Sequence, residues 1–367
     1  MPKTLFPHRD PRLTTSHHPH SSDKQLSTSL LYPLSLLLNT VLHTLKQGPR
    51  TEAKTKNKGG QMTIQTVQIP HHLNGTTAAY QTPHPLDSTK PTVVLVNSFT
   101  TSSELYRAQF SDPSLTSKLN LLAIEPLGHG STRTSRSHWT YWDTAEMNLQ
   151  VLDALGIDQA FVLGTSQGGW ITVMMALMRP DKILGVMPLG SSMDSESERS
   201  RALGCWDGAA LLTPFVEKWT PSTTTGTAEF EPEDTYCDAL IAAGLNDCDD
   251  GVRQFWRNAI KANYRGDDGR QRIRMAAINL VERSGLHLRL ADVKCPVLWL
   301  HVCPFPSLPS PALAMDACML ISTTGDGGRG IQRGQCQRRG REVPKCPLGD
   351  CRGGCAFPEL LESRGCE

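Results

Sequence analysis

Five short apolar runs recur through the middle of this 367-residue chain, and turn residues bound each of them. The runs occupy residues 93–96, 119–125, 159–164, 183–190 and 295–301. Continuous apolar strands are typical of a parallel sheet, because helices cover both of its faces. Helical apolar periodicity separates them, most clearly over residues 142–155 and 167–178. This alternation predicts an α/β fold with a doubly wound, mostly parallel sheet, preceded by a pair of strands at 62–70 and 76–82.

A long interval, residues 194–292, breaks that rhythm because it contains no clear sheet strand. Its apolar spacing instead predicts helices over residues 206–219, 232–244, 251–264 and 270–283. Helices inserted at the carboxyl end of such a sheet usually form a lid over a site. We therefore divide the globular part into a core at 62–193, a helical lid at 194–292 and a further core strand at 293–301.

The overall composition excludes several classes of protein. Hydrophobic residues make up 38% of the chain and charged residues 20%, unlike disordered, collagen-like or coiled-coil chains. The formal net charge is only +1, so the total charge does not indicate a basic nucleic-acid binder. Four cysteines are widely spaced in the globular part, Cys205, Cys237, Cys248 and Cys295. This spacing predicts no disulfide framework, and a reducing compartment is the default.

The first 61 residues differ from the globular part and are predicted to form a disordered leader. Over residues 1–60, nine Lys or Arg stand against three Asp or Glu. The apolar stretch at 30–42 is too short to span a bilayer and lacks the small residues of a signal-peptide cleavage site. We expect no membrane span. The compartment stays open, with the cytoplasm as the default and targeting to an organelle by the basic arm as the alternative.

Residues 302–367 are rich in Gly, Arg and Cys, show no apolar periodicity, and are predicted to form a disordered tail. Seven of the eleven cysteines lie there, but Cys346, Cys351 and Cys355 lack the paired spacing of zinc ligands, so no metal site is expected. Every local signal agrees with one fold up to His301, and none does afterwards. Such a break is unusual in an intact domain, and our hypothesis is that the tail derives from intron or out-of-frame sequence.

The stretch most informative about chemistry is a G-x-S-x-G motif at residues 164–168, between an apolar strand and an apolar helix. This context is typical of a nucleophile elbow, a tight turn that exposes a serine hydroxyl. Gly164 and Gly168 would avoid side-chain clashes around the turn, and Gly169 would let the helix pack on the sheet. We predict Ser166 as the nucleophile, with Gly164 and Gly168 as the elbow glycines.

Acyl transfer at such a serine needs N–H donors for the oxyanion that develops. One donor is expected from the residue after the nucleophile, Gln167, and the other from the loop after an earlier strand. That loop starts at Asn97-Ser98-Phe99, directly after the run at 93–96. We predict an oxyanion hole formed by the N–H groups of Phe99 and Gln167, with Ser98 as the alternative to Phe99.

Together these motifs resemble the α/β-hydrolase fold family over about residues 62–301. The resemblance is carried by residues 97–99, 128–131, 164–168, 189–194 and 293–301. The Gly-His-Gly-Ser turn at 128–131 is similar to the one after the family's fourth strand. Residues 189–194 and the long helical insert resemble a fungal-type, esterase- or lactonase-like subgroup, and 293–301 resembles the strand before the family's catalytic acid. The resemblance implies a serine hydrolase for a small-molecule ester, thioester or lactone, with no cofactor, metal or nucleic-acid partner.

The chain departs from the family where the catalytic acid and histidine are expected. Members place a Gly and an Asp soon after the strand that here ends at His301, and a histidine later. This sequence continues Val-Cys-Pro-Phe-Pro, and no histidine follows His301. The family's last strand and last helix are therefore also predicted to be missing, which would leave an exposed sheet edge beside 295–301.

Other residues of the sequence are candidates for the acid and the base of the triad. We predict Asp194, which follows the run at 183–190, as the catalytic acid, because some relatives place theirs there. A surface or lid-start role is the alternative for Asp194, and Asp316 is a displaced alternative acid. For the base, His129 and His287 stay open, with turn shaping and packing under the lid as their respective alternatives.

The sequence thus predicts a serine hydrolase acting on a carboxylic ester, thioester or lactone through Ser166, with inactivity expected if no base replaces the absent C-terminal segment. The alternative is a non-catalytic α/β-hydrolase-fold protein, either a ligand binder or a truncated product. Haloalkane or epoxide chemistry is disfavoured because those relatives use Asp as the nucleophile. A cofactor-free oxygenase on the same fold stays open, as do the substrate and the oligomeric state.

Overall fold

The computed structural model describes residues 63–70, 75–202, 205–220, 229–245 and 248–304. Beyond these it describes the backbone of strands at 315–322, 337–338 and 341–342, and side chains are described only up to residue 300. The predicted leader at 1–61 lies outside the described residues, as does most of the predicted tail.

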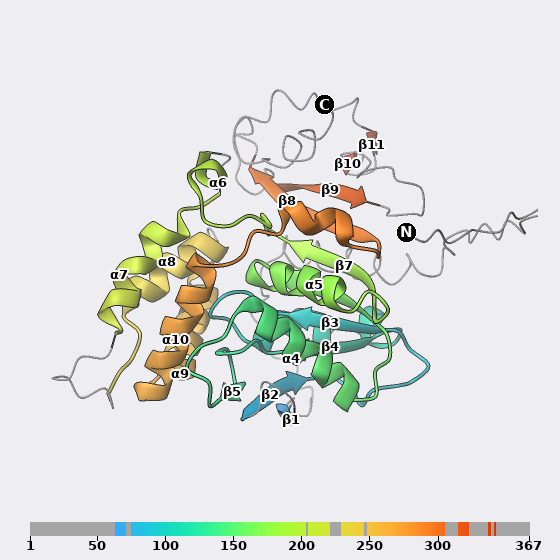
Figure 1. Ribbon diagram of the computed structural model, residues 1–367, viewed down its shortest axis with the longest axis horizontal. Helices are drawn as coiled ribbons and strands as arrows, with labels where there is room; N and C mark the ends of the chain where they lie inside the picture. The colour runs from blue at the N-terminus through green and yellow to red at the C-terminus, as the bar shows by residue number, and fades with distance from the viewer. Residues whose placement is uncertain are drawn as a thin grey trace, which may run out of the picture.

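A nine-stranded sheet runs through the described part of the chain (Figure 1), in the order β1-β2-β4-β3-β6-β7-β8-β9 with β5 paired to β2. Its strands are β1 (Gln65–Ile69), β2 (Thr76–Gln81), β3 (Thr92–Val96), β4 (Asn120–Ile124), β5 (Arg133–Thr134), β6 (Ala160–Thr165), β7 (Ile183–Leu189), β8 (Val297–Pro304) and β9 (Met315–Ser322). The pairs β4–β3, β3–β6, β6–β7 and β7–β8 are parallel, whereas β1–β2, β2–β4 and β8–β9 are antiparallel. The predicted mostly parallel sheet is confirmed.

Both faces of the sheet are covered, which is why β3 and β4 are buried at every position. Val94 belongs to a core that includes side chains of α4 (Tyr141–Ala154) and α5 (Gln167–Met178). Its neighbour Val93 belongs to a second core with Tyr106 and Phe110. Successive strand residues point to opposite faces, so these are the two sides of the sheet. The short helices after β3, namely η1 (Ser103–Tyr106), α2 (Arg107–Phe110) and α3 (Pro113–Thr116), cover the second side.

The interval at 194–292 is helical, and most of its helices lie beyond the carboxyl ends of the parallel strands (Figure 1). We keep the name lid as a label for these residues, and their function as a lid remains a prediction. Its helices are α6 (Glu198–Ala202), α7 (Gly208–Lys218), α8 (Asp234–Leu245), α9 (Asp250–Asn263), α10 (Gly266–Val281) and η2 (His287–Asp292). Side-chain caps start two of them, because Asp207 accepts from Ala210 N and Asp249 from Val252 N. Helix α10 begins earlier than predicted, and two aspartates in its first turn favour that start.

The sheet continues past the point where the sequence analysis ended it. Strand β8 runs to Pro304 rather than His301, and β9 pairs antiparallel with it from Val297↔Ser322 to Pro304↔Met315. No strand was predicted there, and an exposed edge was expected instead. The free edge of β8 presents a row of unpaired N–H and C=O groups, and pairing with a further strand satisfies them. A separate antiparallel pair, β10 (Gln337–Arg338) and β11 (Arg341–Glu342), follows.

Candidate functional site

Ser166 lies in the turn between β6 and α5, and its backbone is strained. Its φ is 53° and its ψ −118°, outside the regions that non-glycine residues ordinarily adopt. Two hydrogen bonds hold it there, from Ser166 N to Leu189 O at 2.8 Å and from Ser191 Oγ to Ser166 O at 2.6 Å. The side chain is partly exposed, and within the described residues no group hydrogen-bonds its hydroxyl.

The two elbow glycines are required by close backbone contacts. A Cβ on Gly164 would overlap the carbonyl of Gly168 and lie 2.7 Å from Gly169 N. A Cβ on Gly168 would overlap the Val96 carbonyl, with its carbon at 2.9 Å. These neighbours are main-chain atoms, which cannot rotate away. A side chain at either position would therefore force the main chain of the turn to shift.

The two predicted oxyanion donors come from neighbouring strands. Gln167 is the first residue of α5, so its N–H has no acceptor within the helix. Phe99 follows β3, and Gln167 follows β6. Because β3 and β6 pair in parallel, both residues lie at the carboxyl ends of the strands. Asn97 closes the Phe99 loop, because its Nδ2 donates to Thr101 O at 2.8 Å, and Thr100 has a φ of 58°. In the described part of the chain, the Phe99 N–H has no acceptor either.

Gln167 also takes part in a buried polar chain behind the elbow. Its Nε2 lies 2.9 Å from His129 Nε2, and its Oε1 accepts from Tyr141 OH at 3.2 Å. His129 Nδ1 lies 3.0 Å from Leu127 O. Burial lowers the pKa of His129 to about 4, so the ring is neutral at pH 7. With both nitrogens engaged, His129 is not free to act as a base for Ser166, and this differs from one of the two open alternatives for the base.

Asp194 and His287 lie beside each other at the start and end of the lid. Asp194 follows β7 and is 6% exposed. His287 opens η2, and its Nδ1 lies 3.4 Å from Asp194 Oδ1. The contact is held by the main chain, because Leu286 N donates to Met193 O at 2.7 Å. The contact is not a hydrogen bond, and His287 Nδ1 has no hydrogen-bond partner among the described residues.

Glu125 is a buried acid that the sequence analysis did not single out. It is 1% exposed, and its carboxylate accepts from Ser103 N at 3.1 Å, Ser103 Oγ at 2.9 Å and Ser131 N. Gly130 has no room for a Cβ because Glu125 occupies the space. The acid thus ties the segment after β3 to the turn after β4. The only available signal was an acidic residue directly after an apolar run.

The aromatic side chains of the lid are mostly packed in its core. Trp219 is 2% exposed and Tyr264 0%, and Trp219 packs edge-on against Tyr236 with ring centroids 4.7 Å apart. Only Trp206 and Phe255 of the lid's aromatic residues remain exposed to a substantial degree among the described residues. Arg107 lies over the Phe255 ring, with its Cζ 4.8 Å from the centroid.

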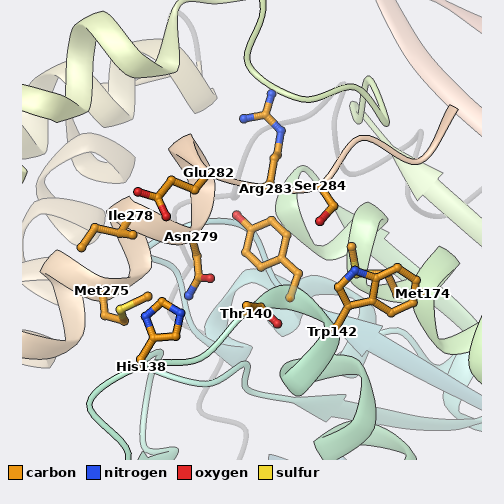
Figure 2. A pocket seen from close by; sticks show the side chains of 11 residues that line it. His138, Thr140, Trp142, Met174, Met275, Ile278, Asn279, Glu282, Arg283 and Ser284 are labelled. Atoms are coloured by element: carbon orange, nitrogen blue, oxygen red, sulfur yellow. The ribbon is translucent and has the colours of Figure 1, made fainter.

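A small cavity of about 60 Å³ lies between α4, α5 and α10 (Figure 2). The residues that line it are His138, Thr140, Tyr141, Trp142, Met174, Met275, Ile278, Asn279, Glu282, Arg283 and Ser284. Ser166 is not one of them. Within the described residues no three His, Cys, Asp or Glu side chains come together to hold a metal ion, and no helix has the length and apolar character to cross a membrane.

Comparisons with known proteins agree with the fold. A family model described as the alpha/beta hydrolase fold matches residues 91–267. The chain is 31% identical to the uncharacterized hydrolase YugF of Bacillus subtilis (strain 168), over 28% of this chain and 37% of that protein. It is 27% identical to a 1-acylglycerol-3-phosphate O-acyltransferase of Arabidopsis thaliana, over 36% of this chain and 34% of that protein. The chain therefore spans about a third of the length of these curated relatives.

A solved structure supports the same conclusion for the fold alone. The crystal structure of a probable hydrolytic enzyme from Pseudomonas aeruginosa PAO1 matches with a TM-score of 0.51 and 13% identity, covering 65% of this chain and 73% of that chain. Strands β3, β4, β6 and β7 and the strand–turn–helix around Ser166 all fall within the residues of the family match. Residues 91–267 of this chain match the α/β-hydrolase fold family, and the described structure has that fold.

Proposed function

We propose that this chain is a serine hydrolase in which Ser166 attacks the carbonyl carbon of a carboxylic ester, thioester or lactone. The observation that carries the proposal is the backbone of Ser166, with φ at 53° between two glycines that cannot accept a Cβ. Strain at a partly exposed serine between a strand and a helix is typical of a nucleophile elbow. A serine that merely capped the helix would be extended and would accept an N–H of the first turn, and Ser166 makes no such bond.

The proposed reaction proceeds through an acyl-enzyme. The Ser166 oxygen forms a bond to the carbonyl carbon, and the carbonyl oxygen gains negative charge between the N–H groups of Phe99 and Gln167. Each such donor is worth about 3 kcal/mol of barrier. The leaving alcohol, thiol or ring oxygen departs with the proton that the serine lost. Water then attacks the acyl group and frees Ser166.

Asp194 and His287 are proposed as the acid and base of this reaction. A triad needs a carboxylate against one imidazole nitrogen, so that the other nitrogen can take the serine proton. The 3.4 Å approach of Asp194 Oδ1 to His287 Nδ1 supports the first half of that arrangement, and the proposal requires the two atoms to move closer to form a hydrogen bond. The Ser191 hydroxyl, three residues before Asp194, donates to Ser166 O, so the loop that carries the acid also touches the elbow.

A non-catalytic α/β-hydrolase-fold protein is the second candidate, and one observation favours it. In the described part of the chain, no histidine nitrogen hydrogen-bonds the Ser166 hydroxyl. A serine without a base keeps its proton and is a weak nucleophile. Such a protein would bind a ligand near Ser166 without hydrolysing it.

A fluorophosphonate probe separates the two candidates. The purified full chain is incubated with the probe, and the adduct is located by mass spectrometry. An adduct on Ser166 that is absent from Ser166→Ala and retained in the exposed-serine control Ser137→Ala supports the hydrolase. No adduct on a folded wild-type chain supports the non-catalytic candidate. For a reactive chain, hydrolysis of short esters, thioesters and lactones then identifies the substrate class, and product analysis with an added alcohol separates hydrolysis from acyl transfer.

A further inference from the structure

We infer that His129 is a positioning residue for the oxyanion hole, acting through the side chain of Gln167 to fix the first turn of α5. The inference rests on the proposed function of Ser166, since it concerns the N–H donor of that same site. His129 lies in the turn after β4, and Gln167 is the first residue of α5. Their side chains meet in the interior, at 2% and 0% exposure.

One main-chain carbonyl, that of Leu127, determines the direction of the hydrogen bonds that link His129, Gln167 and Tyr141. Leu127 O can only accept, so His129 Nδ1 must carry a hydrogen. Because the ring is neutral, His129 Nε2 is then an acceptor. Gln167 must therefore turn its NH₂ group toward His129, which leaves Oε1 facing Tyr141. The Tyr141 hydroxyl donates to that oxygen. In these three hydrogen bonds, every donor thus faces an acceptor.

This arrangement fixes the side chain of Gln167 from two sides, and its main chain carries the proposed oxyanion donor. The same imidazole also touches the other proposed donor residue, because the rings of His129 and Phe99 pack edge-on with centroids 6.2 Å apart. His129 is therefore in contact with both residues whose N–H groups would bind the oxyanion. Small displacements matter at such a site, since a shift of about 1 Å can lower a rate by about 10²-fold.

Two substitutions of His129 separate its two hydrogen bonds. His129→Gln places an amide near the position of Nε2 and can keep the bond to Gln167, whereas His129→Asn reaches only the position of Nδ1 and can keep the bond to Leu127. Both remove the imidazole, so a purely structural role for the ring predicts similar effects. A positioning role predicts that His129→Gln retains most of the activity, and that His129→Asn lowers kcat by about 10²-fold with little change in KM.

A pair of substrates that differ only at the carbonyl reports on the oxyanion hole directly. A thionoester carries sulfur where the ester carries oxygen, and sulfur accepts hydrogen bonds poorly. The wild-type chain should prefer the oxygen ester strongly, and His129→Asn should lose much of that preference while His129→Gln keeps it. Equal preferences in all three proteins, or equal loss of kcat in both variants, would overturn the inference.

Failure of the proposed function and failure of this inference give different results. A wild-type chain that does not react with the fluorophosphonate overturns both. A wild-type chain that reacts at Ser166, together with a fully reactive, folded His129→Asn, overturns the inference alone. If His129→Asn does not fold, the ¹⁵N spectrum of wild-type His129 provides the test, because the inference requires a hydrogen on Nδ1 and none on Nε2 at pH 7.

Discussion

The Nδ1 atom of His287 lies 3.4 Å from the Oδ1 atom of Asp194, although most of the lid lies between the two residues in sequence. The hydrogen bond from Leu286 N to Met193 O joins the residue immediately before each of them. This hydrogen bond brings the segment that enters the lid next to the segment that leaves it. Asp194 Oδ1 accepts a hydrogen bond from Ser195 N at 2.9 Å, which fixes the carboxylate beside the imidazole.

If this pair supplies the base for Ser166, removing the imidazole must slow the reaction of the serine. We expect His287→Ala to lower the rate of fluorophosphonate labelling by about 10²- to 10⁴-fold, the usual contribution of general-base catalysis. Asp194→Asn should also slow it, because the amide can stabilise the wrong tautomer of the imidazole. His84→Ala, at an exposed histidine between β2 and β3, is the control and should label at the wild-type rate. Wild-type rates in both His287→Ala and Asp194→Asn would exclude the pair as acid and base.

A second prediction concerns the stability of the fold in acid. Burial is the largest cause that lowers the pKa of His129 from 6.5 to about 4, the nearby Arg272 charge lowers it further, and the bond to the Leu127 carbonyl opposes them. Between pH 6.5 and 4 the unfolded chain binds a proton at this residue and the folded chain does not. Stability is therefore complete above pH 6.5 and falls as the pH decreases through that window.

The expected loss from this residue is about 3 kcal/mol between pH 7 and pH 4. Other acids titrate over the same range, so the measurement is a comparison with His129→Gln, which has no titrating side chain there. Urea unfolding at pH 7 and pH 4 should show a smaller loss of the free energy of unfolding for His129→Gln than for the wild type. Equal losses would mean that the pKa of His129 is not lowered in the folded state.

Much of the fold could be predicted because its signals are local. Apolar runs gave the parallel strands, and the predicted helix at 167–178 has the observed bounds of α5. The start of α10 was placed too late because Gly266 and the two aspartates after it look polar, although they suit a helix N-terminus. Strand β9 was missed because its pairing depends on the free edge of β8, a feature of the tertiary structure.

The site could be predicted only in part, for a similar reason. A motif with fixed spacing located Ser166 and its glycines. The contact of His129 with Gln167, and that of Asp194 with His287, join residues distant in sequence, and neither spacing nor periodicity reports on such pairs. Glu125 was missed because one acid after an apolar run has no distinguishing pattern until its three donors are known.

A third prediction tests whether the elbow needs glycine. Gly164→Ala would push a methyl group into the Gly168 carbonyl, so we expect a destabilisation of at least 1–3 kcal/mol, about the cost of overpacking a core. Gly244→Ala is the matched control, because Gly244 lies within α8 with open space around the added methyl group. Alanine favours a helix over glycine by about 1 kcal/mol, so the control should be slightly stabilised. Thermal unfolding of both variants checks the pair, and a neutral Gly164→Ala would contradict the elbow geometry.

A fourth prediction concerns the ion pair that joins the end of α10 to the start of the lid. Arg283 Nη1 lies 2.7 Å from Glu196 Oε1, with side-chain exposures of 3% and 8%. Arg283 Nε also donates to Asp194 O at 3.0 Å, and its guanidinium lies over the Trp170 ring at 4.8 Å from the centroid. Helix α5 carries Trp170, so this arginine connects the lid to the helix that follows the elbow.

Removing one partner of a buried pair leaves the other charge uncompensated, which typically costs about 3–5 kcal/mol. We therefore expect Glu196→Gln to destabilise the chain by about that amount, and Glu196→Gln combined with Arg283→Met to cost less than the single change. The exposed pair of Arg289 and Asp292, at 52% and 56% side-chain exposure, is the control. Asp292→Asn should change the free energy of unfolding by less than about 1 kcal/mol, because water screens exposed pairs. Similar small effects at Glu196 and Asp292 would show that water reaches the base of the lid and that the lid is not held there by charge.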